Sequence, residues 1–469
     1  MSDSLYNEFN SISAKQWKQK IQADLNGVDY NEALVWETND GIKVKPFYHQ
    51  EEFKKLPIKS TKKNCSICQS IFISDEKTAS YLAKDALQKG ATSLQFEANT
   101  AFDIKELLIG IVAQSDSEES LKIHFKLNFL SESFLSDLIA QTKTYKVYLN
   151  IDLIGNLAKT GNWFYNQNRD HEVLGNMLKV ASNNTSILSV DVALYQNAGA
   201  TIVQQVAYAL AHGNEYLNHL DITNSSLSTK VLECQTSCNE IQFHFAVGSN
   251  YFFEIAKLRA FKYLWKLLLE AYEQKSKAII FVQPSVRNKT IYDYNVNLLR
   301  TTTECMSAIL GGADSISNLA YDAVYHKKNE FGERISRNQL LILQEESYFR
   351  VANQIADGSY YIETITEQVS EKALTLFKDI EKNGGFLKQL QAGTIQRKIE
   401  ESALNEQVQF DNGEVILLGT NKHTNPNDKM KDELALYPFV KINPRKTLIK
   451  PIIARRLAEK LEKERLDTT

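Results

Sequence analysis

Three aspartates border short apolar segments in a pattern that could serve acid/base chemistry. Asp152 follows "KVYLNI", Asp191 lies near the end of "SILSVDV", and Asp314 lies within "ADSISN". Carboxylates at the ends of neighbouring strands can act as a general acid and a general base. An aspartate directly after a strand can also cap the helix that follows it. The sequence leaves both interpretations open, and helix capping is the simpler one.

The cysteines could form a metal site or a redox site. The chain has five: Cys65, Cys68, Cys234, Cys238 and Cys305. Cys65-x-x-Cys68 has the spacing of a zinc or redox pair, and Cys234 with Cys238 would have to complete a zinc site. However, Cys68 leads directly into "QSIFIS", which predicts a strand rather than the turn of a zinc knuckle. We therefore expect reduced thiols and no bound metal.

Histidines and glycines offer weaker signals. His124 and His244 lie inside apolar segments, where a packed and hydrogen-bonded ring is expected. Gly311 and Gly312 could seat a phosphate, but a turn is the better interpretation of this pair.

Eight short segments rich in β-branched and aromatic residues alternate with longer amphipathic segments. They are "QSIFIS" (69–74), "SLQFEA" (93–98), "KIHFKLNF" (122–129), "KVYLNID" (146–152), "SILSVDV" (186–192), "IQFHFAV" (241–247), "AIIFVQP" (278–284) and "ADSISN" (313–318). This alternation predicts a (β/α)8 TIM barrel over residues 65–350, with an N-terminal extension over 1–64 and a C-terminal helical segment over 351–469. Chemistry in such barrels lies at the C-terminal strand ends, which here also offer Ser74, Asp75, Glu97, Asn128, Gly248, Gln283, Ser285 and Ser315.

Helical periodicity is clear in two of the intervening segments. One segment is predicted to begin at Ala200 and to end at Gly213, a typical C-terminal cap. The other places five apolar side chains on one face: Ile255, Leu258, Phe261, Leu264 and Leu268.

Composition excludes several classes of partner. The 469 residues are 43% hydrophobic and 24% charged, with a net charge of −3. No long basic or acidic block favours nucleic acid or a membrane surface. The first residues, "MSDSLYNEFN", lack the features of a signal peptide, and no apolar segment approaches the roughly 18 residues of a membrane span. We expect a cytoplasmic protein.

Several longer segments resemble the barrel domain of the methylmalonyl-CoA mutase family. The resemblance runs in order between residues 40 and 440, over "GIKVKPFY", "LYQNAGATIVQQVAYALAHGNEYL", "NYFFEIAKLRAFKYLW", "LLRTTTECMSAILGGADSI", "FGERISRNQLLILQEES" and "FDNGEVILLGTNK". It implies an adenosylcobalamin-dependent radical isomerisation between methylmalonyl-CoA and succinyl-CoA. It also implies that CoA passes through the barrel and that cobalamin binds a second, C-terminal domain.

This chain departs from the active members that it resembles at five aligned positions. Thr160 replaces an arginine that contacts the substrate carboxylate, and Leu194 replaces a histidine. Ile279 and Phe281 replace an arginine and a histidine, and Gly312 replaces a further histidine. The family's extended loop before the first barrel strand, with its active-site tyrosine, is also missing. A buried carboxylate without a cationic partner would cost several kcal/mol, so we expect an inactive mouth that Leu194 helps to close.

The resemblance also implies where the cofactor and the partner belong. The family's cobalamin loop, D-x-H-x-x-G, does not occur in the sequence, and "RDHEVLG" lacks its spacing. The last residues, "RLAEKLEKERLDTT", predict a solvated helix. We therefore expect a non-catalytic small subunit that binds no cofactor and pairs with a large catalytic subunit, which holds adenosylcobalamin.

Two other functions and one ambiguity remain open. The chain could be an independent hydrolase or lyase that uses Asp152, Asp191 and Asp314, or a CoA-binding regulatory barrel. The N-terminal extension is the first candidate for the subunit contact, although its apolar residues could equally cover their own barrel. They are Trp17, Ile21, Leu25, Tyr30 and Trp36.

Overall fold

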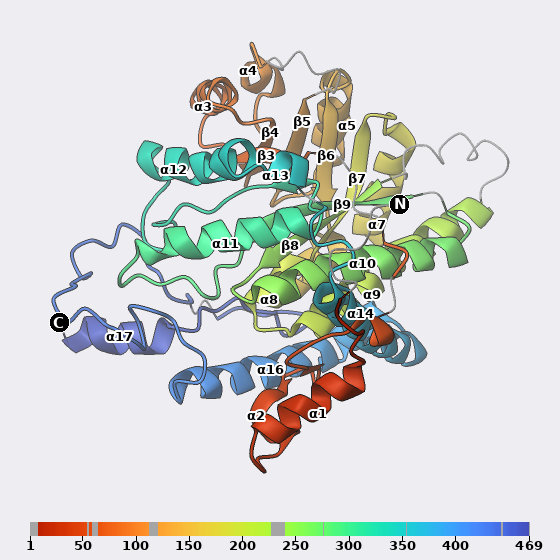
Figure 1. Ribbon diagram of the computed structural model, residues 1–469. Helices are drawn as coiled ribbons and strands as arrows, with labels where there is room; N and C mark the ends of the chain where they lie inside the picture. Colours follow the sequence, from red (N-terminus) through yellow and green to blue (C-terminus); the bar gives the residue numbers. More distant parts are fainter. Residues whose placement is uncertain are drawn as a thin grey trace.

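A closed, all-parallel barrel forms the centre of the molecule, as the sequence predicts (Figure 1). The computed structural model describes residues 8–53, 56–58, 64–111, 121–226, 240–274, 276–352, 354–441 and 444–468, without the side chains of 220–226. The barrel strands pair in the order β10-β3-β4-β5-β6-β7-β8-β9. They are β3 (Ser66–Phe72), β4 (Ser93–Ala98), β5 (Lys122–Leu127), β6 (Lys146–Ile151), β7 (Thr185–Asp191), β8 (Glu240–Val247), β9 (Lys277–Pro284) and β10 (Ser315–Ile316).

Helices surround the barrel and supply most of its apolar core. They are α3 (Glu76–Gln88), α4 (Ile104–Leu108), α5 (Glu132–Gln141), α6 (Leu153–Thr160), α7 (Gln167–Val180), α8 (Val192–Asn197), α9 (Ile202–Ser226), α10 (Tyr251–Ala271), α11 (Val296–Leu310) and α12 (Glu330–Leu341). The predicted apolar face of α10 is confirmed for Ile255, Leu258, Phe261 and Leu264, which are buried, whereas Leu268 is half-buried. The Phe261 ring meets Phe243 of β8 at a centroid distance of 4.5 Å. No described helix is long and apolar enough to cross a membrane.

The predicted end of a helix at Gly213 is wrong. Helix α9 continues through this residue. A Cβ atom at position 213 would lie 2.6 Å from the Trp265 ring and 3.1 Å from that of Phe243. Glycine is therefore present because a neighbouring indole packs directly against the helix backbone, and not because the helix terminates there.

The N-terminal extension is attached to the barrel mainly through its second half. It contains α1 (Ala14–Asp24), α2 (Tyr30–Leu34), the antiparallel pair β1 (Trp36–Glu37) and β2 (Lys43–Val44), and the 3₁₀ turn η1 (Gln50–Glu52). Ile42, between the two strands, is fully buried in the main core. Helix α1, in contrast, has no buried residue and lies at the edge of the molecule (Figure 1).

The C-terminal part contains helices at both ends and a long non-helical segment between them. The helices are α13 (Phe349–Ala352), which follows a π-helical turn η3 (Ile342–Glu346), α14 (Tyr360–Lys382), α15 (Phe386–Gln391), α16 (Thr394–Asp411) and α17 (Glu459–Thr468). Helix α14 packs against α9 and α10. The prediction of a solvated final helix is wrong in part, because Glu462 is fully buried and pairs with Arg456 at 2.6 Å.

Residues 448–457 form an extended segment that crosses several elements at the C-terminal strand ends. Ile452 N donates to the carbonyl oxygen of Ala158 in α6 (2.7 Å), and Leu448 N donates to that of Gly161, directly after α6 (2.9 Å). Arg455 N donates to the Asn197 carbonyl at the end of α8 (3.0 Å). Backbone hydrogen bonds thus hold this segment, which we call the C-terminal strap, across α6 and α8.

Candidate functional site

The structure brings two of the three predicted carboxylates together and separates the third. Asp152 follows β6 and Asp191 ends β7, and Asp191 N donates to Asp152 Oδ2 at 2.7 Å. Asp314, however, precedes β10, and its carboxylate accepts a hydrogen bond from Ile280 N at 2.8 Å. Since the strands are parallel, Asp314 lies at the N-terminal end of the barrel. The predicted set of three carboxylates is therefore wrong.

The remaining strand-end aspartates cap helices. Asp152 accepts from Gly155 N (2.7 Å) at the start of α6, and Asp191 accepts from Leu194 N (3.3 Å) at the start of α8. Asp75 caps α3 in the same way, by accepting from Thr78 N at 3.0 Å. The capping interpretation is thus confirmed for Asp152 and Asp191, and Asp75 plays the same role.

Asp152 is also the centre of a buried polar cluster that the sequence did not reveal. Tyr216 Oη donates to Asp152 Oδ1 at 2.7 Å, and His212 Nε2 lies 3.0 Å from the same oxygen. The Tyr195 hydroxyl lies 2.9 Å from His212 Nδ1. Burial raises the pKa of the Asp152 carboxyl, but His212 and the hydrogen bonds outweigh it and hold the pKa below its usual value. Asp152 therefore carries its charge inside an internally paired cluster.

Large side chains fill the barrel axis at mid-height. The His124 ring from β5 stacks on Tyr148 of β6 at 4.7 Å and lies 5.0 Å from the Phe281 ring of β9. His124 Nδ1 lies 3.0 Å from Oε1 of Gln242, which comes from β8. All four side chains are at most 3% exposed. Aromatic and amide groups thus interlock where a ligand passing along the axis would have to lie.

The axial histidines are held neutral. Burial lowers the pKa of His124 to about 3, although its hydrogen bond to Gln242 Oε1 acts in the opposite direction. Burial also lowers the pKa of His244 to about 3, and nearby Lys126 acts in the same direction. His244 Nε2 lies 3.1 Å from Asn150 Oδ1. Both histidines are therefore packed and hydrogen-bonded strand residues, as the sequence predicts.

The five altered positions lie on different elements of the barrel. Leu194 is 8% exposed in α8. Phe281 is buried on the axis, two residues along β9 from the half-buried Ile279. Thr160 is the last residue of α6, where its hydroxyl donates to backbone carbonyls. Gly312 lies before β10, at the opposite end of the barrel from Leu194. Strand direction thus places Gly312 at the N-terminal end of the barrel, away from Leu194.

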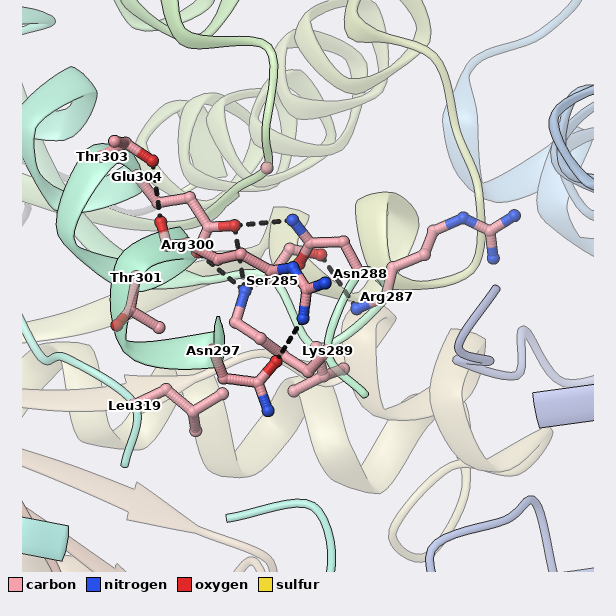
Figure 2. A network of polar contacts seen from close by, with 12 residues as sticks. Ser285, Arg287, Asn288, Lys289, Asn297, Arg300, Thr301, Thr303, Glu304 and Leu319 are labelled. Carbon is pink, nitrogen blue, oxygen red and sulfur yellow. Dashed lines mark hydrogen bonds and ion pairs between the residues drawn. The ribbon is translucent and has the colours of Figure 1, made fainter. Parts of the chain in front are cut away.

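The loop that follows β9 contains a second buried cluster, which Figure 2 shows from close by. Lys289 Nζ donates to both carboxylate oxygens of Glu304 (2.9 and 2.8 Å) and to Asn288 Oδ1 (2.7 Å). The Lys289 and Glu304 side chains are each 1% exposed. Arg300 Nη1 donates to Asn297 Oδ1 at 2.8 Å. Lys289 and Glu304 thus neutralise each other in the buried loop, while Arg300 donates to neutral oxygen acceptors.

The cysteines do not form a metal site in the part of the chain that the structure describes. Cys65, Cys68 and Cys305 are buried, free thiols. Burial raises the pKa of Cys68 to about 12, so its thiol is protonated and unreactive at neutral pH. Cys234 and Cys238 lie outside the described residues. Within the described ranges, no group of three or more histidine, cysteine, aspartate or glutamate side chains could hold a metal ion.

These features define the class of the chain as a (β/α)8-barrel protein whose axis is filled by its own side chains. The family model described as Methylmalonyl-CoA mutase matches residues 139–463. The chain is 32% identical to the methylmalonyl-CoA mutase small subunit of Porphyromonas gingivalis, over 92% of this chain and 73% of the relative. The chain belongs to the methylmalonyl-CoA mutase family.

Two further relatives place the chain within that family. It is 28% identical to the methylmalonyl-CoA mutase of Cereibacter sphaeroides, over 87% of this chain and 64% of that protein. It is also 28% identical to the large subunit of the Porphyromonas gingivalis mutase, over 61% of this chain and 40% of that subunit. The chain therefore spans less than two thirds of the length of these two relatives.

Proposed function

We propose that this chain is a non-catalytic small subunit of methylmalonyl-CoA mutase and that it acts beside a large catalytic subunit. The filled axis is the observation that carries the proposal. A CoA thioester threaded along the barrel would have to displace His124, Tyr148 and Phe281, which are packed against one another. Removing such side chains from a close-packed interior costs several kcal/mol. The free energy of CoA binding would have to exceed this cost.

The polar groups at the mouth support the same proposal. Asp152 and His212 already satisfy each other, and Lys126 lies 3.8 Å from Glu97. His212 and Lys126 each lie beside a carboxylate of this chain. A substrate carboxylate would therefore have to compete with Asp152 or Glu97 for either basic group. The hydrolase alternative loses its third carboxylate, because Asp314 lies at the other end of the barrel.

The cofactor of the family does not fit the described histidines at this mouth. His212 is fully buried between Asp152 and Tyr195, and His244 contacts Asn150 and Phe281. Neither imidazole is available to a cobalt ion, and the sequence contains no D-x-H-x-x-G loop. We assign adenosylcobalamin to the large subunit and derive no step through it in this chain.

Two observations support a large subunit as the partner. Porphyromonas gingivalis has both a small and a large mutase subunit, and this chain resembles each of them. In addition, α1 buries none of its residues against the rest of the chain, and Trp17 is 48% exposed. We propose a cytoplasmic heterodimer in which the extension contacts the large subunit.

Co-expression with the large subunit from the same genome tests this function. We expect one-to-one co-elution, interconversion of methylmalonyl-CoA and succinyl-CoA by the complex, and none by the small chain alone. Turnover by the isolated chain with added adenosylcobalamin would contradict the proposal. Tight binding of a CoA thioester to the isolated chain, without turnover, would instead favour a regulatory CoA-binding barrel.

A further inference from the structure

The sequence contains three asparagine–glycine pairs, at residues 26–27, 383–384 and 412–413. Each pair lies where a helix ends, after α1, α14 and α16 respectively, and both residues of each pair are exposed. Asparagine is chemically labile, and glycine after it has no side chain to shield its backbone nitrogen from the neighbouring side-chain amide. No step of the proposed function uses these pairs.

In two of the pairs, the backbone nitrogen of the glycine is held by a hydrogen bond. Gly384 N and Gly413 N each donate to the carbonyl oxygen of the third preceding residue, at 3.0 and 3.1 Å. The Asn383 side chain is restrained as well, because its Nδ2 donates to the Asp379 carbonyl oxygen at 2.7 Å. A nitrogen held in this way can attack the neighbouring amide only after its own hydrogen bond opens.

The pair in the turn between α1 and α2 differs at this nitrogen. Gly27 N donates no hydrogen bond to any residue that the structure describes, and the Asn26 side chain makes none there either. The flanking nitrogens of Asn26 and Val28 do donate within the turn, at 3.3 and 3.1 Å. A Cβ atom at Gly27 would meet no other atom within 4 Å. The nitrogen of Gly27 is therefore free of both hydrogen bonding and steric protection.

We propose that Asn26 is the preferred site of spontaneous deamidation in this chain. A base takes the proton from Gly27 N, and this nitrogen bonds to the side-chain carbonyl carbon of Asn26. The bond from that carbon to the amide nitrogen breaks, ammonia leaves with the proton, and a cyclic succinimide remains. Water then opens the ring at either carbonyl carbon. The products are aspartate and iso-aspartate, whose backbone runs through the former side-chain carbon, and both carry a new negative charge.

The new carboxylate lies just beyond the C-terminal end of α1. The last turn of α1 contains no basic residue, and Lys20 in the preceding turn already pairs with Asp24 at 2.5 Å. The negative end of the helix dipole disfavours a further anion there. Since no residue of α1 is buried, tertiary packing cannot offset this loss. Deamidation therefore loosens α1 and, in a step that rests on the proposed function, weakens the contact with the large subunit.

Peptide mapping by mass spectrometry tests the site on the full chain, aged in mildly alkaline buffer. We expect Asn26 to convert at least about fivefold faster than Asn383 and Asn412, which corresponds to about 1 kcal/mol for the hydrogen bond that the other two glycines must open. In the urea-unfolded chain the three rates should be similar, because glycine follows each asparagine. Equal or faster conversion of Asn383 or Asn412 in the folded chain would overturn the proposal, as would an Asn26 that stays intact while the unfolded chain converts.

Trypsin measures the loosening of α1 without a partner, since Lys15, Lys18 and Lys20 lie within this helix. Once Asn26 is converted, the aged chain should be cut at these lysines about two- to fivefold faster than the fresh chain. Asn26→Gly is the matched control, because glycine accepts the φ of +50° at this position and has no side-chain amide to lose. Its cleavage rate should not change with age. Equal cleavage of fresh and aged wild-type chain would overturn the effect on α1.

Co-elution with the large subunit tests the step that rests on the proposed function. The fresh wild-type chain and the aged Asn26→Gly chain should both co-elute, whereas the aged wild-type chain should lose part of its co-elution. If the fresh chain does not co-elute, the proposed subunit function is wrong, while the peptide map and the trypsin assay still decide the deamidation site. Equal co-elution of fresh and aged wild-type chains would show that deamidation does not weaken the association.

Discussion

Lys289 and Glu304 illustrate how single residues in this chain depend on their partners. Burial lowers the pKa of Lys289 and raises that of Glu304, while each opposes the shift through its charge on the other. With both side chains 1% exposed, neither charge has water as an alternative partner. Both residues are needed for the stability of the loop after β9, because removal of either one leaves the charge of the other buried without a counter-charge.

Glu304→Gln should therefore lower the free energy of unfolding by about 3–5 kcal/mol, because it leaves the Lys289 ammonium unpaired. The double variant Lys289→Met, Glu304→Leu should recover most of this loss, because it removes both charges together. Urea unfolding of Glu304→Gln and of the double variant measures the difference. A double variant less stable than Glu304→Gln would contradict this account.

The buried imidazole of His124 should make stability depend on pH. The unfolded chain takes up a proton near pH 6.5, whereas the folded chain keeps this ring neutral down to a pKa of about 3. The contribution of His124 to the free energy of unfolding is therefore fully present above pH 6.5 and is lost as the pH decreases toward 3. Over this range, His124 should change the free energy of unfolding by up to about 1.4 kcal/mol per pH unit.

His124→Gln should reduce that slope between pH 6.5 and 5 in urea unfolding experiments. His326→Gln is the matched control, because the His326 side chain is 40% exposed. The control should leave the slope close to that of the wild type. Equal slopes for His124→Gln and the wild type would show that the His124 ring is protonated in the folded chain.

At the scale of elements, the local pattern identified all eight barrel strands, but some boundaries depended on distant contacts. The predicted strand at 69–74 begins at Ser66, because Ser66 pairs with Ser315 across the closure of the barrel. The helix predicted to end at Gly213 continues, because the glycine accommodates Trp265. In both cases a contact remote in sequence overrides a local signal.

The C-terminal strap gives an element-scale prediction. Gly161 has a φ of +80°, and a Cβ there would lie 2.7 Å from the Ile449 carbonyl oxygen. Gly161→Ala should lower the free energy of unfolding by about 2–4 kcal/mol, since it adds overpacking to backbone strain. Faster proteolysis within residues 448–457 should accompany this loss.

Gly413→Ala is the control, because Gly413 has a φ of +78° and no atom within 4 Å of the added Cβ. Gly413→Ala should lower the free energy of unfolding by only about 1 kcal/mol, the cost of a non-glycine residue in the left-handed conformation. If both variants lose the same stability, close contact with the strap contributes nothing.

At the scale of the whole molecule, the N-terminal extension gives the clearest test of association. Removal of residues 1–28 deletes α1 and retains the buried Tyr30 and Ile42. We expect this deletion to abolish co-elution with the large subunit while the melting temperature stays near that of the wild type. Permanent complexes bury more than about 2,000 Å², so the loss of a main contact should be visible by size exclusion.

Two other results of this deletion would change the interpretation. One-to-one co-elution of the shortened chain would show that α1 is not the main contact. A large drop in melting temperature would show that α1 stabilises its own barrel, although it buries none of its residues in the isolated chain.

The sequence by itself determined the barrel and the family, and it favoured helix capping as the simpler role of Asp152 and Asp191, because strand periodicity and capping are local properties of the chain. Only the tertiary structure decided the ends at which Asp314 and Gly312 lie, since β10 has only two residues and its pairing sets its position. The filled axis and the Lys289–Glu304 pair also needed the fold. Each joins residues that are distant in the chain or on different elements, and no local periodicity records such contacts.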